Sequence, residues 1–145
     1  MRKKIGIIGG VGPQATNFIY SKIIEFSQKK YNARENADYP KIIIESVPVP
    51  DFISSKEKLD IAKEMLINAT KSLSSAGATR LFIGSNTVHI LLDELQKNTN
   101  VSFDSMVKLV SKHCVEKGFK KVGILGTPIL ISSNLYQEEL KKRED

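Results

Sequence analysis

Four short apolar runs separated by helical patterns constrain the fold of this 145-residue chain more than any other feature. Each run is compact, rich in Ile, Val or Leu, and continuous, as in a parallel strand that is covered on both faces. The runs occupy residues 5–8, 42–44, 81–83 and 122–125. Together they predict an α/β fold in which right-handed β–α–β units build a parallel sheet flanked by helices.

Helical patterns fill the stretches between the runs. Pro13 stands where the first turn of a helix accepts proline, and Ser54 with Glu57 forms a plausible capping box for a second helix. Further helices are predicted from about residues 88, 105 and 134. The first helix is expected to gather its apolar side chains on one face, and these are Ala15, Phe18, Ile19, Ile23 and Phe26.

The composition excludes several classes of protein. The chain is 41% hydrophobic and 26% charged, which is ordinary for a globular domain. No apolar run approaches the roughly 18 residues that a membrane span needs. The basic N-terminus precedes an apolar region that is too short and too rich in glycine for a signal peptide. We therefore expect a cytoplasmic protein without a membrane partner.

The cysteine, histidine and charged side chains further limit the kinds of ligand that the chain could bind. A single cysteine, Cys114, excludes an internal disulfide and a cysteine-based zinc cluster. His89 and His113 are too few and too far apart for a convincing metal site, so no metal is expected. The net charge of +6 would permit nucleic-acid binding, but the lysines are scattered in pairs without interleaved aromatics. The sequence favours a small ligand over a nucleic acid.

Four loops should meet where that ligand binds. In an open α/β sheet, ligands gather at the carboxyl ends of the strands, where the following helices begin. The segments at this position are residues 9–13, 48–51, 84–87 and 126–128, and all are small, polar or conformationally special. Because helix N-termini present N–H groups and a positive dipole, this rim suits a small anion.

The glycine loop also permits a nucleotide reading. Gly10, Gly12 and Ala15 match the dinucleotide-binding spacing of a strand–turn–helix unit. That motif needs an acidic residue at the end of the second strand, about 20 residues on, to hold a ribose. Glu45 is the only candidate and lies 30 residues after Ala15. A tight turn that feeds a helix explains the glycines as well as all the ligand-binding interpretations together.

The segment Ser85-Asn86-Thr87 indicates a ligand site more specifically than the glycine loop does. Its hydroxyl and amide groups at a strand end would suit a carboxylate or an amino group, although Asn86 or Thr87 could simply cap the next helix. His89 is more typical of a packed or surface histidine than of a base. Cys114 lies on an apolar helix face, which favours a buried structural thiol over a nucleophile.

Taken in order, these motifs resemble the aspartate/glutamate racemase family. The resemblance extends over most of the chain, and the segments that carry it are residues 5–16, 48–51, 76–89 and 121–137. It implies two similar α/β domains with the active site between them. Here the first domain corresponds to residues 1–100, and residues 101–145 correspond to the beginning of the second.

The resemblance implies a cofactor-independent isomerase that interconverts L- and D-aspartate or glutamate. Two groups on opposite faces of the substrate would remove and return the Cα proton, because a single base cannot invert the centre. Ser85 stands at the position of the first catalytic group. The implied substrate-binding residues, which would hold a small amino acid or dicarboxylate, are Gly10, Val11, Gly12, Asp51, Asn86, Thr87 and Thr127.

Three departures from the family pattern open an alternative. Ser85 replaces the cysteine of most members, and a hydroxyl is a poorer base than a thiolate. The second cysteine motif is absent from residues 1–145, and Phe52 stands where several aspartate racemases have an arginine. The alternative is a non-catalytic amino-acid or carboxylate-binding protein. An incomplete second sheet would leave an unpaired edge, so we also expect a homo-oligomer, such as a dimer, or a partner chain.

Overall fold

A parallel sheet forms the centre of the molecule. The computed structural model describes residues 4–52 and 55–143. Within these residues the strands are β1 (Lys4–Gly9), β2 (Lys41–Ser46), β3 (Arg80–Ile83) and β4 (Phe103–Asp104). They form one four-stranded sheet in the order β2-β1-β3-β4, and each neighbouring pair is parallel. The predicted α/β class with a parallel sheet is confirmed.

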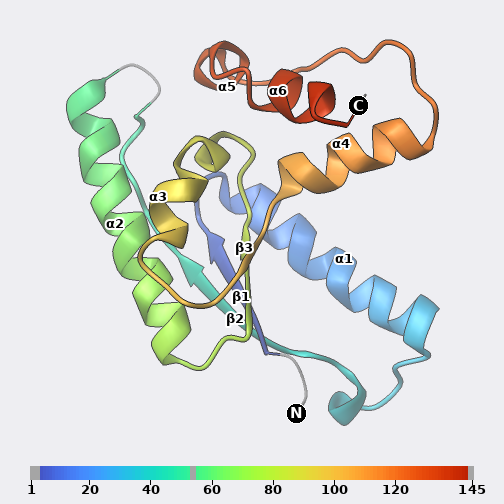
Figure 1. The fold of residues 1–145 in the computed structure, drawn as a ribbon. Helices are drawn as coiled ribbons and strands as arrows, with labels where there is room; N and C mark the ends of the chain where they lie inside the picture. Colours follow the sequence, from blue (N-terminus) through green and yellow to red (C-terminus); the bar gives the residue numbers. More distant parts are fainter. Residues whose placement is uncertain (1–3, 53–54, 144–145) are drawn as a thin grey trace.

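Helices cover the two faces unequally. The described α-helices are α1 (Pro13–Tyr31), α2 (Lys56–Ser75), α3 (Leu92–Gln96), α4 (Met106–Glu116), α5 (Pro128–Ser132) and α6 (Leu135–Lys141), and short 3₁₀ turns span Asn36–Asp38 (η1) and Thr87–Leu91 (η2). Figure 1 shows α2 and α3 on one side of the sheet and α1 on the other. Helices α5 and α6 lie beyond the end of the sheet where the loops after β1 and β3 emerge.

The helix starts follow from local chemistry. Pro13 occupies the first turn of α1, as predicted. Ser55 caps α2, and its hydroxyl accepts a hydrogen bond from the Lys58 N–H. The predicted capping residue Ser54 lies outside the described residues. Ser105 caps α4 in the same way, because its hydroxyl accepts from the Lys108 N–H. These caps satisfy N–H groups that have no partner inside the helix.

The core lies between the sheet and α2. Fully buried side chains come from both layers and include Ile8, Leu81, Ala62, Leu66 and Leu73. Each buried aliphatic side chain of this size contributes about 1.5–3 kcal/mol relative to exposure. The α2 face is therefore the main source of stability for the sheet and for the loops that leave it.

The predicted strand at residues 122–125 is wrong. Residues 121–127 form no helix or strand, and Leu125 is 98% exposed. An apolar run becomes a strand only when a neighbour takes up its N–H and C=O groups, and no described strand pairs with this segment. The fourth strand is instead β4, whose two residues are too short to produce a recognisable pattern. The division into domains 1–100 and 101–145 stays a prediction.

The predicted apolar face of α1 does form, but it is not buried. Thr16 and Ser27 are the buried residues of this helix. Phe18 is 61% exposed and Phe26 is 54% exposed. The helical spacing of the apolar residues was correct, but spacing alone does not reveal whether another layer covers them.

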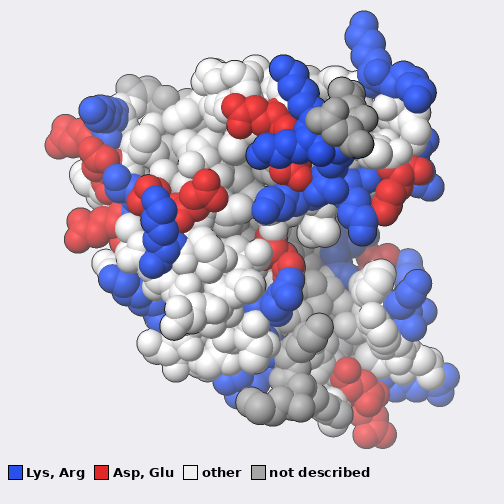
Figure 2. Space-filling view, in the orientation of Figure 1, with Lys and Arg blue, Asp and Glu red and all other residues white. Residues whose placement is uncertain are grey.

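Charged side chains of both signs share the visible surface. Figure 2 shows Lys and Arg most densely over the part of this face where α4 and α6 lie, with Asp and Glu among them. Such mixing is typical of a solvated protein surface. Among the helices of the described residues, none is both long enough and apolar enough to cross a membrane.

The loop after β1 requires glycine at position 10. Gly10 has a φ of 86°, in the left-handed region that favours glycine. A Cβ atom there would lie 2.5 Å from the backbone nitrogen of Val47 and 2.7 Å from its carbonyl oxygen. The chain can thus leave β1 and pass close to the end of β2 only without a side chain at this position.

We therefore predict that Gly10→Ala lowers the free energy of unfolding by about 2 kcal/mol or more, because it adds left-handed strain and a backbone clash. Gly123→Ala is the matched control, because a Cβ atom at position 123 would meet nothing within 4 Å. Urea unfolding of the two variants measures the difference. Equal stabilities would contradict the close approach of the two loops.

Candidate active site

Loops from four separate parts of the chain converge on one cavity. The cavity has a volume of about 320 Å³ and lies at the carboxyl ends of β1, β2 and β3. Its lining residues are Gly10, Val11, Gly12, Val49, Pro50, Asp51, Phe52, Ser85, Thr87 and Thr127. A space of this size suits a ligand such as an amino acid. The segments predicted to meet at the strand ends thus line one continuous cavity.

Seven of the eight residues predicted for the site line this cavity, and only Asn86 does not. The seven come from segments that are far apart in the sequence, so no local feature of the chain required them to meet. Parallel pairing brings them together, since it places the carboxyl ends of neighbouring strands at one edge.

Hydrogen bonds from the first loop fix one wall of the cavity. The Gly10 N–H donates to Thr16 Oγ1 at 3.0 Å, and the Val47 N–H donates to the Gly9 carbonyl at 3.0 Å. Thr16 is buried in the first turn of α1. Because this threonine occupies the Gly10 N–H, that group is not available to a pyrophosphate. The contact argues for the tight-turn reading of the glycines over the dinucleotide reading.

A bond between two threonines closes the opposite wall. Thr87 Oγ1 and Thr127 Oγ1 lie 3.0 Å apart, although 40 residues separate them in the sequence. Thr127 also caps α5, because its hydroxyl accepts from the Leu130 N–H at 3.4 Å. The segment before α5 therefore belongs to the same cavity as the loop after β3.

Asn86 faces a different space from its two neighbours. Its Oδ1 accepts a hydrogen bond of 2.7 Å from the Tyr136 hydroxyl, and it lines a small pocket shared with Cys114. Burial raises the pKa of Tyr136, with a smaller contribution from Cys114. Asn86 is the residue before η2, but its side chain makes no capping hydrogen bond. Helix capping therefore does not explain why an asparagine stands at this position. Cys114 is half-buried rather than fully buried.

Ser85 is half-buried in the wall of the cavity. Its hydroxyl makes no hydrogen bond with any of the described residues. Asp51 is the one ionisable side chain among the described lining residues. Within the described residues, no three His, Cys, Asp or Glu side chains are grouped so that they could hold a metal. The chemistry of this wall therefore rests on hydroxyl and backbone groups.

His89 holds the loop that carries Ser85. The residue is 3% exposed, with Nδ1 at 2.8 Å from the Ser85 carbonyl oxygen and Nε2 at 3.0 Å from the Met106 nitrogen. A carbonyl can only accept and an N–H can only donate, so the partners assign the neutral tautomer with the proton on Nδ1. His89 binds the backbone of Ser85 rather than its hydroxyl. It is a packed histidine, as the sequence suggested, and not a base for Ser85.

Tyr136 binds the loop after β3 through Asn86, a role that the sequence did not predict. It lies 50 residues after Asn86, and the residue is 8% exposed. Its segment was part of the family resemblance, but nothing in the residue pattern assigned it a role. The bond that it forms depends on how α6 folds back over the loop after β3, which only the tertiary structure reveals.

Comparisons with known proteins show the family to which the chain belongs. The sequence pattern of the Asp/Glu/Hydantoin racemase family matches residues 8–144. The broad specificity amino-acid racemase RacX of Bacillus subtilis (strain 168) is 32% identical over 137 residues, which are 94% of this chain and 60% of that protein. The match covers nearly the whole chain, so the chain belongs to the Asp/Glu/hydantoin racemase family.

Solved structures show the same fold. The crystal structure of PH1733, an aspartate racemase homologue from Pyrococcus horikoshii OT3, matches with a TM-score of 0.81 and 36% identity over 97% of this chain and 61% of that chain. The Picrophilus torridus aspartate racemase matches with a TM-score of 0.76 and 30% identity over 97% of this chain and 59% of that chain. The present chain thus spans about three fifths of the length of these relatives.

The environment of His89 predicts a pH dependence of stability. Burial lowers the pKa of His89 from its ordinary value near 6.5, and the backbone bonds at Ser85 and Asn86 oppose this shift only in part. The unfolded chain therefore takes up the proton first as the pH falls. The free energy of unfolding should decrease below about pH 6.5 and continue to decrease until the folded-state pKa is passed.

The measurement is urea unfolding at several pH values between about 7.5 and 5, a range above that in which most carboxylates titrate. His89→Gln should lose most of the slope, whereas His113→Gln, a change at an exposed histidine, should keep it. An unchanged slope in His89→Gln would show that another group titrates in this range.

Proposed function

We propose that the cavity is the amino-acid site of a racemase-type isomerase and that Ser85 acts on one face of the substrate Cα. The observation that carries the proposal is the convergence of Ser85, Thr87 and Thr127 with the Gly10–Gly12 loop in one cavity of about 320 Å³. The family supports racemisation as the reaction class. We propose that it proceeds by cofactor-independent proton transfer at Cα. Binding without catalysis is the competing outcome.

The donors around the cavity support binding of a carboxylate. Gly12, the N-cap residue of α1, lines the cavity, so the positive dipole end of this helix faces the ligand. Ser85 adds a hydroxyl group that can donate to oxygen, and one of Thr87 and Thr127 can do the same, because the hydrogen bond between the two threonines uses the hydrogen of only one of them. Such donors also stabilise the negative charge that develops on the carboxylate when the Cα proton leaves.

The lining argues against a strong preference for acidic side chains. Among the described lining residues there is no Lys or Arg, and Phe52 lies in place of a basic residue, buried at 4% exposure. Aspartate and glutamate follow from the family name, but we propose that neutral amino acids bind at least as well. The broad specificity described for the Bacillus relative is compatible with this proposal.

Inversion needs a second group on the opposite face of Cα. The described residues place hydroxyl and backbone groups around Ser85 but only one ionisable side chain, Asp51, in the cavity. About two fifths of the length of the relatives has no counterpart in this chain. We propose that the second group belongs to that part of the racemase fold. The chain alone should then exchange the Cα proton mainly with retention.

The test is solvent exchange in D2O, with the α-proton of each enantiomer followed by NMR. Aspartate, glutamate, alanine and serine form the substrate panel. The wild-type chain should exchange at least one neutral amino acid with retention of configuration. Ser85→Ala should lower that rate by about a hundredfold, the smaller end of what a positioned acid–base group contributes.

Ser102→Ala is the matched control, because Ser102 is exposed and contributes only its backbone carbonyl, which accepts from the Leu81 N–H. Equal rates in Ser85→Ala and the wild type would remove Ser85 from the reaction. Exchange with inversion would place the second group within this chain or a second copy. No exchange with any amino acid, together with saturable binding, would contradict catalysis and leave an amino-acid-binding protein.

A further inference from the structure

Cys114, the single cysteine of the chain, stands between two hollows that are separate from the amino-acid cavity. One hollow has a volume of about 360 Å³ and the other about 190 Å³, and Cys114, Val122 and Leu140 line both. Their walls come mainly from α4, α6 and the segment that joins α4 to α5. Because Cys114 is half-buried rather than enclosed, a small molecule in either hollow can reach the thiol.

The larger of these two hollows is basic. Lys120, Lys121 and Arg143 line it, and none of its described lining residues is acidic. Arg143 is paired with Glu139 at 2.7 Å, so the uncompensated charge comes from the two lysines, which form no ion pair with the described part of the chain. Figure 2 shows basic side chains gathered over α4 and α6. Such a group of cations attracts an anion to the vicinity of the thiol.

The smaller hollow contains a buried hydroxyl without a partner. Ser111 is 1% exposed, and its Oγ is the one buried side-chain polar atom that lacks a hydrogen bond among the residues described. Ser111 lies three residues before Cys114 in α4, so the two side chains share one face of the helix. Buried polar groups of folded proteins nearly always have a partner. The hollow therefore offers a hydrogen-bonding position beside the thiol to a molecule that enters it.

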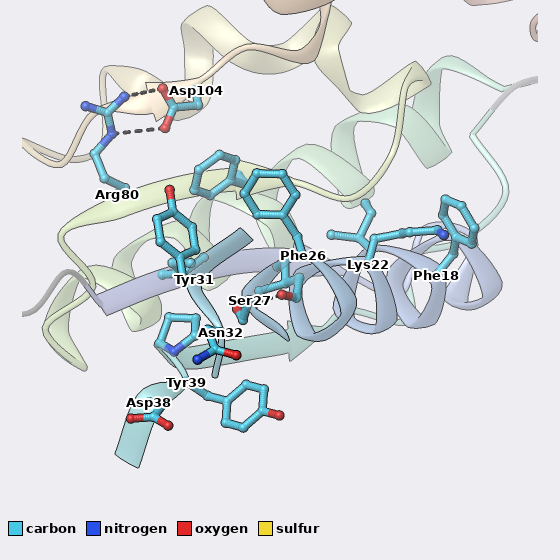
Figure 3. A pocket seen from close by; sticks show the side chains of 15 residues that line it. Phe18, Lys22, Phe26, Ser27, Tyr31, Asn32, Asp38, Tyr39, Arg80 and Asp104 are labelled. Atoms are coloured by element: carbon cyan, nitrogen blue, oxygen red, sulfur yellow. Dashed lines mark hydrogen bonds and ion pairs between the residues drawn. The ribbon is translucent and has the colours of Figure 1, made fainter. Parts of the chain in front are cut away.

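A larger hollow lies along α1 but has no comparable features. Figure 3 shows this groove, which has a volume of about 1070 Å³ and neither a cysteine nor a histidine in its lining. Arg80 at its edge is bonded to Asp104 (Figure 3), and the Ser27 hydroxyl donates to the Ile23 carbonyl. Size alone does not make a site, whereas the hollows at Cys114 combine a nucleophile, two cations and an unpartnered hydroxyl.

We propose that Cys114 is a site of reversible mixed-disulfide formation with anionic low-molecular-mass thiols. The sulfur of the Cys114 thiolate attacks one sulfur of a symmetrical disulfide, and a new S–S bond forms as the old one breaks. Cys114 is thereby oxidised, and the other half of the reagent leaves as a reduced thiolate. The proton that Cys114 gave up passes through solvent to this leaving thiolate. Lys120 and Lys121 bind carboxylates of the added half, and Ser111 bonds one of its polar groups.

The modification also reaches the loop that carries Ser85. Asn86 and Tyr136, which are joined by a hydrogen bond of 2.7 Å, line the smaller hollow together with Cys114. A group attached to the sulfur would compete with this pair for a space of about 190 Å³. Loss of the bond would release Asn86 from α6. The redox state of Cys114 would thus bias the position of the loop after β3.

The experiment is exchange of the 145-residue chain with glutathione disulfide at low ionic strength, followed by intact-protein mass spectrometry. Because Cys114 is the only cysteine, every adduct is assigned to it. Bis(2-hydroxyethyl) disulfide, which carries no charge, is the reference reagent. Lys120→Gln/Lys121→Gln should lower the rate constant with glutathione disulfide about fivefold or more relative to the neutral reagent, and about 1 M salt should abolish the difference.

Lys58→Gln/Lys71→Gln is the matched control, because it removes the same charge from exposed positions of α2. It should keep the wild-type ratio of the two rate constants. An equal ratio in both double variants would overturn the role of the basic hollow. No adduct on the folded chain, together with full reaction in urea, would overturn the site itself, because the thiol would then be out of reach.

Two further measurements test the smaller hollow. Ser111→Ala should lower the equilibrium constant for the glutathione adduct about threefold, the effect of one lost hydrogen bond, and an unchanged constant would remove Ser111 from the site. In the wild-type adduct, the amide NMR signals of Asn86 and Tyr136 should shift. Unchanged signals at both positions would overturn the link between Cys114 and the loop after β3.

Discussion

The parallel pairing of β1 with β2 on one edge and with β3 on the other is the constraint on which the candidate active site depends. The register places Gly9 beside Ser46, and Ile8 beside both Glu45 and Ile83. The three strands therefore end at one level, and the loops that leave them are held side by side. The α2 core stabilises this arrangement from one face, because Leu66 and Leu73 are fully buried beneath the sheet. Any ligand of the cavity meets a surface whose shape was set by strand register rather than by the loops themselves.

Long-range polar contacts complete the site around the loop that carries Ser85. Thr87 is bonded to Thr127, Asn86 to Tyr136, and the Ser85 carbonyl to His89, which in turn accepts from the first N–H of α4. Each contact links this loop to a later part of the chain. The arrangement positions the Ser85 hydroxyl without engaging it, which leaves it available to a ligand. Such preorganisation is what a site needs when it must stabilise a developing charge.

Much of this organisation was predictable from the sequence, because parallel strands and their loops obey local rules. Apolar runs predicted β1, β2 and β3, and strand ends predicted a common rim that includes Gly10, Ser85 and Thr127. The rest depended on neighbours that no periodicity encodes. Residues 122–125 are as apolar as a strand but have no pairing partner, and Phe18 and Phe26 have helical spacing but no covering layer. Asn86 was predicted beside the ligand, but its amide oxygen accepts a hydrogen bond from Tyr136 in α6, a helix that folds back over the loop after β3.

The account rests on the claim that the cavity at the strand ends binds an amino acid through its carboxylate. The most direct test is titration of the ¹⁵N-labelled chain with alanine and with its methyl ester, followed by amide NMR shifts. The account predicts saturable shifts at Gly10, Gly12, Ser85 and Thr127 with alanine, much weaker shifts with the ester, and little change along the exposed face of α1. Equal responses to both compounds, or shifts confined to α1, would contradict it.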